Sequence, residues 1–274
     1  MGKESNGADC ATLVISCDKY SDLWRPFFTL FWCHWPDCPF PVYLGSNGES
    51  FSHARVTNIR VGEDWSWSDS LRQMLLALDS DYVLVFLEDF FLRHLVDTGR
   101  VLACLGALHT LDGHMLRLHP NPGPDRAVPG FPDIGRIDAG APYRVSAQVA
   151  FWRRESLLGI LREGESAWEF ECKATKRSEK LGEGFFCVRR RAIDYGHHVV
   201  ERGKWFRHEA RRFGRMGIGC DLSRRPIMTR REGWRWRCNK TFYNLWLHIP
   251  WRQREQLTTF IHFLKGKPRK KSGL

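Results

Sequence analysis

Short, continuous apolar runs alternate with segments of helical periodicity along most of the chain. ATLVISC (11–17) and YVLVFL (82–87) are apolar and rich in β-branched residues, as strands buried on both faces of a sheet should be. Apolar runs of this kind mark strands at 11–17, 41–47, 55–62, 82–87, 114–119, 143–152, 185–190 and 192–200. Helical spacing marks 21–35, 66–78, 97–111, 153–162 and 165–181. This alternation predicts an α/β fold with a mostly parallel sheet flanked by helices.

Composition limits the class of protein. The 274 residues are 43% hydrophobic, enough to bury a full core. No run of 18 apolar residues occurs and the N-terminus has no signal-peptide pattern, so we expect neither a membrane-spanning helix nor secretion. The nine cysteines are odd in number, scattered and without a C-x-x-C pair, which favours a reducing compartment, the cytoplasm.

Two stretches lack clear strand or helix patterns. Residues 120–141 are rich in Gly and Pro, and we expect a long loop there that closes over a ligand as a lid. From about residue 203 the pattern becomes irregular.

Charge divides the chain into two parts. Residues 1–185 hold 19 Lys/Arg and 25 Asp/Glu, whereas residues 186–274 hold 23 and 6. In the basic part Trp234, Trp236, Trp246 and Trp251 are interleaved with arginines. Basic, aromatic segments lie in the interface of anionic membranes, and this is the partner we favour. Packing against the domain is one alternative, and single-stranded nucleic acid, an unlikely partner without a recognised binding motif, is another.

Polar clusters follow three of the predicted strands: Ser16 to Asp18, Ser46-Asn47 and Glu88-Asp89. Ligands of open α/β sheets bind beyond the carboxyl ends of the strands, so these clusters should border a ligand crevice. Glu88 and Asp89 are solvated capping residues, a general acid/base pair, or a site for a divalent cation that bridges a diphosphate. We favour the cation, because Mg or Mn needs few carboxylates when phosphate oxygens complete its shell.

The order of several segments resembles a family of bacterial glycosyltransferase-like proteins. The segments are ISCDKYSDLW, FPVYLGSN, WSDSLRQML, LVFLEDFF, YRVSAQVAFWRRESLLGILREGESAWEFE and VERGKW. The resemblance implies a GT-A type, Rossmann-like fold over residues 11–207. It leaves residues 1–10 as a disordered N-terminus and residues 208–274 as a basic, Trp/Arg-rich extension. In GT-A enzymes an Asp-x-Asp motif at a strand end binds metal and donor diphosphate, and here adjacent Glu88 and Asp89 take that place.

The resemblance also implies roles for individual residues. Ser16 and Asp18 would lie near the nucleoside, with turn formation the structural alternative for Asp18. Trp67, Ser68 and Arg72 would border the sugar diphosphate, with a surface arginine the alternative for Arg72. Asp89 would be the ligand of Mn or Mg.

The segment ESAWEFE (165–171) contributes to the acceptor side. Ser166 and Glu169 fit the S-x-x-E capping box. Glu171 is then the candidate general base that deprotonates an acceptor hydroxyl, with a structural pairing to Arg144 or Arg153 as the alternative. Trp168 would form a platform for a sugar ring, or else pack in the core.

These observations predict a cytoplasmic glycosyltransferase, peripheral on the inner membrane face. It would move a sugar from a nucleotide-diphosphate donor to a glycan or lipid-linked acceptor. The alternatives are a basic nucleic-acid-binding protein, a glycosyltransferase acting on nucleic acid, and a catalytically inactive GT-A scaffold.

Overall fold

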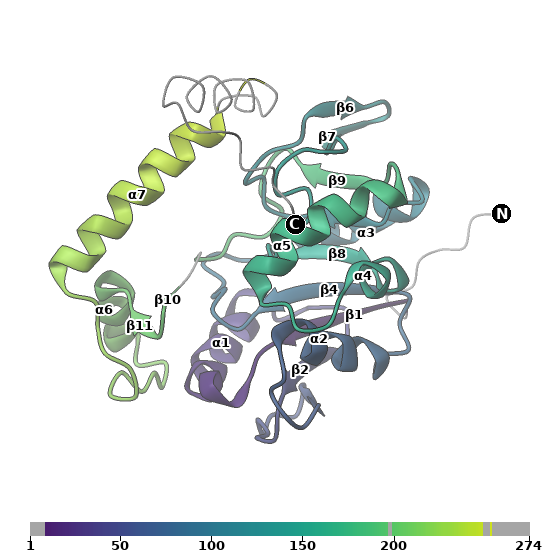
Figure 1. The fold of residues 1–274 in the computed structure, drawn as a ribbon. Coiled ribbons are helices and arrows are strands. Elements are labelled where there is room, and N and C mark those ends of the chain that lie inside the picture. Colours follow the sequence, from purple (N-terminus) through teal and green to yellow (C-terminus); the bar gives the residue numbers. More distant parts are fainter. Residues whose placement is uncertain (1–8, 197–198, 249–252, 254–274) are drawn as a thin grey trace.

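A nine-stranded sheet with helices on both faces forms the body of the protein (Figure 1). The computed structural model describes residues 9–196, 199–248 and 253. The strands of this sheet are β1 (Cys10–Ile15), β2 (Val42–Ser46), β3 (Thr57–Arg60), β4 (Tyr82–Leu87), β5 (Met115–Arg117), β6 (Arg126–Val128), β7 (Phe131–Arg136), β8 (Ala150–Arg153) and β9 (Phe185–Val188). A small separate hairpin pairs β10 (Val200–Glu201) with β11 (Lys204–Trp205).

The α-helices and two short 3-10 helices complete the described part of the chain. They are α1 (Ser21–His34), α2 (Trp67–Leu76), α3 (Thr98–Thr110), α4 (Arg154–Ile160), α5 (Ala167–Arg177), α6 (Arg207–Met216) and α7 (Arg230–His248), with η2 (Asp18–Tyr20) and η3 (Ser178–Leu181).

The strand order of the sheet is β3-β2-β1-β4-β8-β5-β9-β7-β6. The four strands β3, β2, β1 and β4 are parallel neighbours, and the pair β5 and β9 is parallel as well. β8 and β7 are antiparallel to each of their neighbours, so the other strands of the sheet all run in one direction. The α/β fold with a mostly parallel sheet is therefore confirmed.

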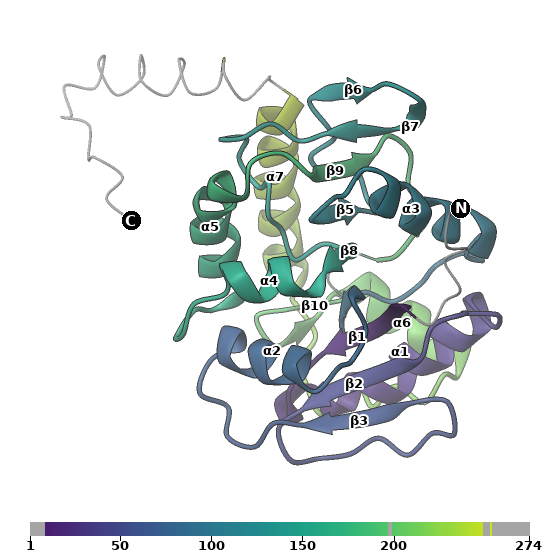
Figure 2. The same cartoon turned by 90° about the vertical axis from the view of Figure 1, so that its right-hand side faces the viewer.

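The alternation of side chains along β4 explains the three layers. Leu84 and Phe86 point into one core with α1 and α3, whereas Val83 and Val85 point into the other with α2, α4 and α5. Figure 2 shows these two groups of helices on opposite sides of the sheet. Both faces of the central strands are covered, which is why their sequences are uniformly apolar.

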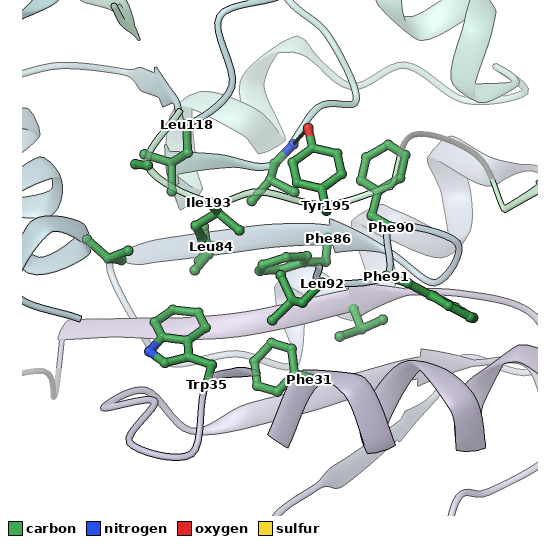
Figure 3. Close-up of a cluster of buried hydrophobic side chains, with 14 of the residues drawn as sticks. Phe31, Trp35, Leu84, Phe86, Phe90, Phe91, Leu92, Leu118, Ile193 and Tyr195 are labelled. Atoms are coloured by element: carbon green, nitrogen blue, oxygen red, sulfur yellow. Dashed lines mark hydrogen bonds between the residues drawn. The ribbon is translucent and has the colours of Figure 1, made fainter. Parts of the chain in front are cut away.

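The acidic pair after β4 is held between two buried apolar segments. Leu84 and Phe86 precede it, and Phe90, Phe91 and Leu92 follow it, each at most 2% exposed and in the same core (Figure 3). Phe90 stacks on Tyr195 at 4.8 Å between ring centroids. The backbone at Glu88 and Asp89 is thus fixed on both sides by core side chains.

Several expected elements differ from the structure. Residues 120–141 contain the hairpin of β6 and β7 at the edge of the sheet, so the expectation of one long loop is wrong. The strands expected at 143–152 and 192–200 are shorter, because only Ala150–Arg153 and Val200–Glu201 pair as strands. Within 192–196 only Tyr195 makes an isolated bridge, to Leu92, and residues 197 and 198 lie outside the described residues.

Among the described residues after 203, two helices occupy much of the segment that was expected to be irregular. α6 contributes Ala210 and Phe213 to the same core as α1, so the extension expected from residue 208 begins inside a helix that packs on the domain. α7 continues from there beyond one end of the strands (Figure 1). Within the described ranges, no helix has the length and apolar composition needed to cross a membrane.

Candidate functional site

The strand order creates a crevice between β1 and β4. From β1 the chain adds β2 and β3 on one side of the sheet, and then crosses to place β4 on the other side of β1. Such a switch point is where open α/β sheets bind ligands, beyond the carboxyl ends of the strands. The ends of β1 and β4 carry Ser16-Cys17 and Glu88-Asp89, so the two predicted clusters lie side by side.

A pocket of about 300 Å³ occupies this position, and we call it the switch-point pocket. Its lining comes from the ends of β1 and β4, from the start of α2, from Ala167 at the start of α5, and from Val200 in β10. Asp64, Glu88 and Asp89 make it acidic. Lys19 pairs with Asp64 at 3.2 Å on the exposed rim.

Glu88 has an unusual environment for a carboxylate. Removal from water, and then the charge of Asp89, raise the pKa of Glu88 to about 8. Arg225 and Asp22 act on the same carboxyl in opposite directions, Arg225 lowering its pKa and Asp22 raising it. Burial and the neighbouring charge therefore favour the protonated form of Glu88 when no cation is bound.

Arg225 joins the C-terminal part of the chain to this site. Its guanidinium donates two hydrogen bonds of 2.7 Å to the carboxylate of Asp22, and the two side chains are 10% and 2% exposed. The guanidinium also lies 4.3 Å from the ring centre of Tyr20, which lines the pocket, and donates to the backbone oxygen of Lys19. Arg225 therefore fixes the segment that follows β1.

Asp18 organises the loop after β2. Its carboxylate accepts hydrogen bonds of 2.9–3.1 Å from the backbone N–H groups of Asn47, Gly48 and Glu49. Its own N–H donates to the Asn47 side chain at 3.2 Å. Ser16 lines the pocket, and its hydroxyl accepts from the indole N–H of Trp24 at 2.7 Å. The turn role considered for Asp18 is present in the structure, and its contact with a nucleoside stays a prediction.

The three residues predicted on α2 lie in different surroundings. Trp67 lines the pocket and packs on Phe170 at 5.2 Å between ring centroids. Ser68 is buried, and its hydroxyl accepts from the backbone N–H of Glu165 at 2.9 Å. Arg72 donates to the backbone oxygens of Leu158 and Leu161 at the end of α4, and it is not among the residues that line the pocket.

The start of α5 borders the pocket through Ala167. Ser166 and Glu169 form the capping box that the sequence indicates, and the hydrogen bonds from Ser166 lower the pKa of Glu169 to about 2. Trp168 is 68% exposed, so it does not pack in the core.

Glu171 lies one helical turn after Ala167 and on the same face of α5. Its Oε1 accepts a hydrogen bond of 2.7 Å from the backbone N–H of Ala147. The arginines considered as its partners have other contacts: Arg144 donates to the backbone oxygen of Ser178, and Arg153 pairs with Asp112.

Sequence reasoning did not identify several residues of the site. Asp64 and Val200 line the pocket, and Arg225 clamps Tyr20 and Asp22 although it is 203 residues from Asp22 in the chain. Each is an ordinary residue type in an unremarkable local sequence, so only the fold reveals its position.

Glu88 and Asp89 fit a divalent cation as a partial ligand set. Within the described ranges, no three His, Cys, Asp or Glu side chains are grouped as ligands of a metal ion. Mg or Mn in phosphate-binding sites needs only one or two carboxylates, because water and phosphate oxygens supply the rest. The adjacent carboxyls at the pocket meet that requirement, and a cation would offset both the burial and the charge of Asp89 that raise the pKa of Glu88.

Comparisons with known proteins give a structural likeness only. No protein family and no curated protein matches the sequence. Among 154 matching chains of solved structures is the crystal structure of S. aureus TarS 1–349. The match has a TM-score of 0.47 and 11% sequence identity, and it covers 68% of this chain and 59% of the TarS chain.

Proposed function

We propose that the protein is a glycosyltransferase whose switch-point pocket binds the nucleoside diphosphate part of a sugar donor. The observation that carries the proposal is the strand order, which brings Ser16 at the end of β1 and Glu88-Asp89 at the end of β4 into one pocket. Nucleotide ligands of doubly wound sheets bind at this position. Trp67 offers an aromatic surface in the same pocket, next to the carboxylates.

Asp89, with Glu88 beside it, would hold Mn or Mg. A bound cation supplies charge neutralisation for the donor diphosphate as the leaving group departs. The apolar residues on both sides of the acidic pair keep these carboxyls in place without ligand. Ser68, Arg72 and Asp18 support this site through α2, α4 and the loop after β2.

Glu171 is the proposed general base. It shares a face of α5 with Ala167, which lines the pocket, and the Ala147 N–H orients one of its carboxylate oxygens. A base held in this way can take the proton from an acceptor hydroxyl as the hydroxyl attacks the anomeric carbon. Trp168 and Glu169 precede it on the same helix, and the exposed indole of Trp168 is available to a sugar ring of the acceptor.

Nucleotide binding tests the proposal directly. UDP or GDP should raise the unfolding temperature of the full chain, more strongly with Mn than with a chelator. Asp89→Asn should weaken Mn-dependent nucleotide binding by about tenfold, ~1.4 kcal/mol, measured by calorimetry. Asp112→Asn is the matched control, because it removes the same charge from an exposed carboxylate outside the pocket. Equal affinity in the folded Asp89 and Asp112 variants would refute the proposed site.

Turnover separates a transferase from an inactive scaffold. A transferase should release UDP or GDP from a nucleotide sugar, slowly to water and faster with an acceptor. A protein that binds nucleotide tightly and never cleaves a nucleotide sugar would be the inactive scaffold.

A further inference from the structure

A second pocket, of about 650 Å³, lies between α6 and α7, and we call it the α6–α7 pocket. It shares no lining residue with the switch-point pocket. Four arginines line it: Arg207 and Arg211 on α6, and Arg230 and Arg237 on α7. In the part of the chain that the structure describes, no acidic side chain is among its lining residues.

The acids nearest to this pocket in sequence already have partners. Glu209 pairs with Arg93 at 2.5 Å and lies 3.3 Å from His208. Glu232 pairs with Lys204 at 2.6 Å and caps the start of α7 through Thr229. These contacts leave the arginine charges of the pocket without a counter-ion from either acid.

Within the described ranges, the arginines of this pocket gather at one place without an acidic partner. Elsewhere in the described residues some arginines, such as Arg93, Arg177 and Arg225, form salt bridges with acids, and others, such as Arg72, donate to backbone oxygens. None of the four pocket arginines forms a salt bridge within the described part of the chain, and the Nε of Arg207 is buried there without a hydrogen-bond partner. Such a gathering of guanidinium groups favours a phosphate ligand, which accepts their paired hydrogen bonds.

Apolar and aromatic side chains form the rest of the wall. Phe206 and Trp236 pack edge to face at 4.6 Å between ring centroids, with buried Met228 also in the lining. Trp234 also lines the pocket and is 64% exposed to solvent. An exposed tryptophan next to arginines is typical of surfaces that rest in the headgroup region of a membrane.

We propose that the α6–α7 pocket binds the phosphate group of one anionic lipid, with the four arginines on the phosphate and the aromatic wall on the adjoining chain. The volume is that of a pocket for one small ligand, whereas nucleic acid would need an extended basic groove. This site is separate from the switch-point pocket, and a lipid bound there would hold the protein on a membrane.

The periodicity of α7 supplies a matched test. Arg230, Gly233, Trp234 and Arg237 are spaced as one helix face and line the pocket, whereas Arg231 and Arg235 are exposed and do not. The variant Arg230→Gln/Arg237→Gln and the variant Arg231→Gln/Arg235→Gln therefore remove equal charge from the same helix. Non-specific attraction to anions predicts equal losses in the two variants.

The probe is dihexanoyl phosphatidic acid, a short-chain soluble lipid, titrated calorimetrically into the full chain. We expect one lipid to bind per chain. The affinity for the lipid should fall by about tenfold or more in Arg230→Gln/Arg237→Gln and in Arg207→Gln/Arg211→Gln. It should be nearly unchanged in Arg231→Gln/Arg235→Gln. Circular dichroism checks that each variant is folded, and nucleotide affinity should be the same in all of them. Failure here therefore leaves the proposed function of the switch-point pocket intact.

Three results would overturn the inference. Equal losses of lipid affinity in the two α7 variants would show non-specific electrostatic attraction rather than a binding site. Inorganic pyrophosphate that binds as tightly as the lipid would show that the ligand is a free phosphate compound. A single-stranded oligonucleotide that displaces the lipid at lower concentration would assign the pocket to nucleic acid.

Discussion

The ion pair between Asp22 and Arg225 should be worth several kcal/mol to the fold, unlike most ion pairs on this protein. Exposed pairs contribute about 0–1 kcal/mol, whereas removal of one partner from a buried pair costs about 3–5 kcal/mol because the other charge is left desolvated. The side chains of Asp22 and Arg225 are 2% and 10% exposed and share two hydrogen bonds of 2.7 Å. The pair therefore belongs to the buried class.

We expect Arg225→Gln to lower the free energy of unfolding by about 3 kcal/mol, because Asp22 then remains buried without its counter-charge. Urea denaturation followed by circular dichroism measures this change. Lys19→Gln is the control, because Lys19 pairs with Asp64 at 3.2 Å while its side chain is 79% exposed. It should cost about 1 kcal/mol or less.

A double-mutant cycle isolates the interaction. In Asp22→Asn/Arg225→Gln both charges are gone, so the double variant should be more stable than the sum of the single losses predicts, by about 1–3 kcal/mol. Additive losses, or a cost of Arg225→Gln no greater than that of Lys19→Gln, would refute the inference that this pair is desolvated and fixes the segment after β1.

Three further predictions concern the acceptor side, pH and packing. Glu171→Gln should keep donor binding but lower turnover by roughly 10²–10⁴ in steady-state assays. Glu169→Gln should lower turnover only mildly, because Gln also serves in a capping box. Full activity of Glu171→Gln would exclude the proposed base. Burial lowers the pKa of His119 to about 4 from its ordinary 6.5, so the unfolded chain binds its proton first and stability falls by about 1.4 kcal/mol per pH unit from pH 6.5 towards 4. His119→Gln should flatten that part of the unfolding profile, and an unchanged slope would contradict the shift. Gly135→Ala should cost about 1–3 kcal/mol in urea denaturation, because its Cβ would lie 2.6 Å from the backbone oxygen of Arg126, whereas Gly106→Ala, with open space in α3, should be neutral or stabilising.

The central strands could be predicted from the sequence because burial on both faces leaves a local signature. β1 and β4 are apolar at nearly every position, and the acidic pair after β4 marks where the strand ends. The hairpin of β6 and β7 has no such signature. It lies at the edge of the sheet, its strands are partly exposed, and its sequence contains Pro and Gly, so it looks like a loop.

The helices of the C-terminal third were missed for a related reason. α6 buries only Glu209, Ala210 and Phe213 among ten residues, four of them arginine, so its mean hydropathy is low and no apolar run marks it as a helix of the domain. The pairing of Arg225 with Asp22 depends on the arrangement of the whole chain in space. The predicted site residues that do line the pocket, Ser16, Trp67, Glu88 and Asp89, are those at or next to the end of a strand or the start of a helix.

The composite lining of the switch-point pocket has a consequence for synthesis of the protein. Its walls come from β1, α2, β4, the start of α5 and Val200, and Arg225 then secures the segment after β1. A ribosome-bound chain that has left the exit tunnel only as far as β9 contains all nine strands of the main sheet but lacks Val200 and Arg225, so the pocket is not yet closed. Donor binding should therefore arise late in translation, after residue 225 has left the exit tunnel, and a chain truncated after β9 should form a sheet with no functional site.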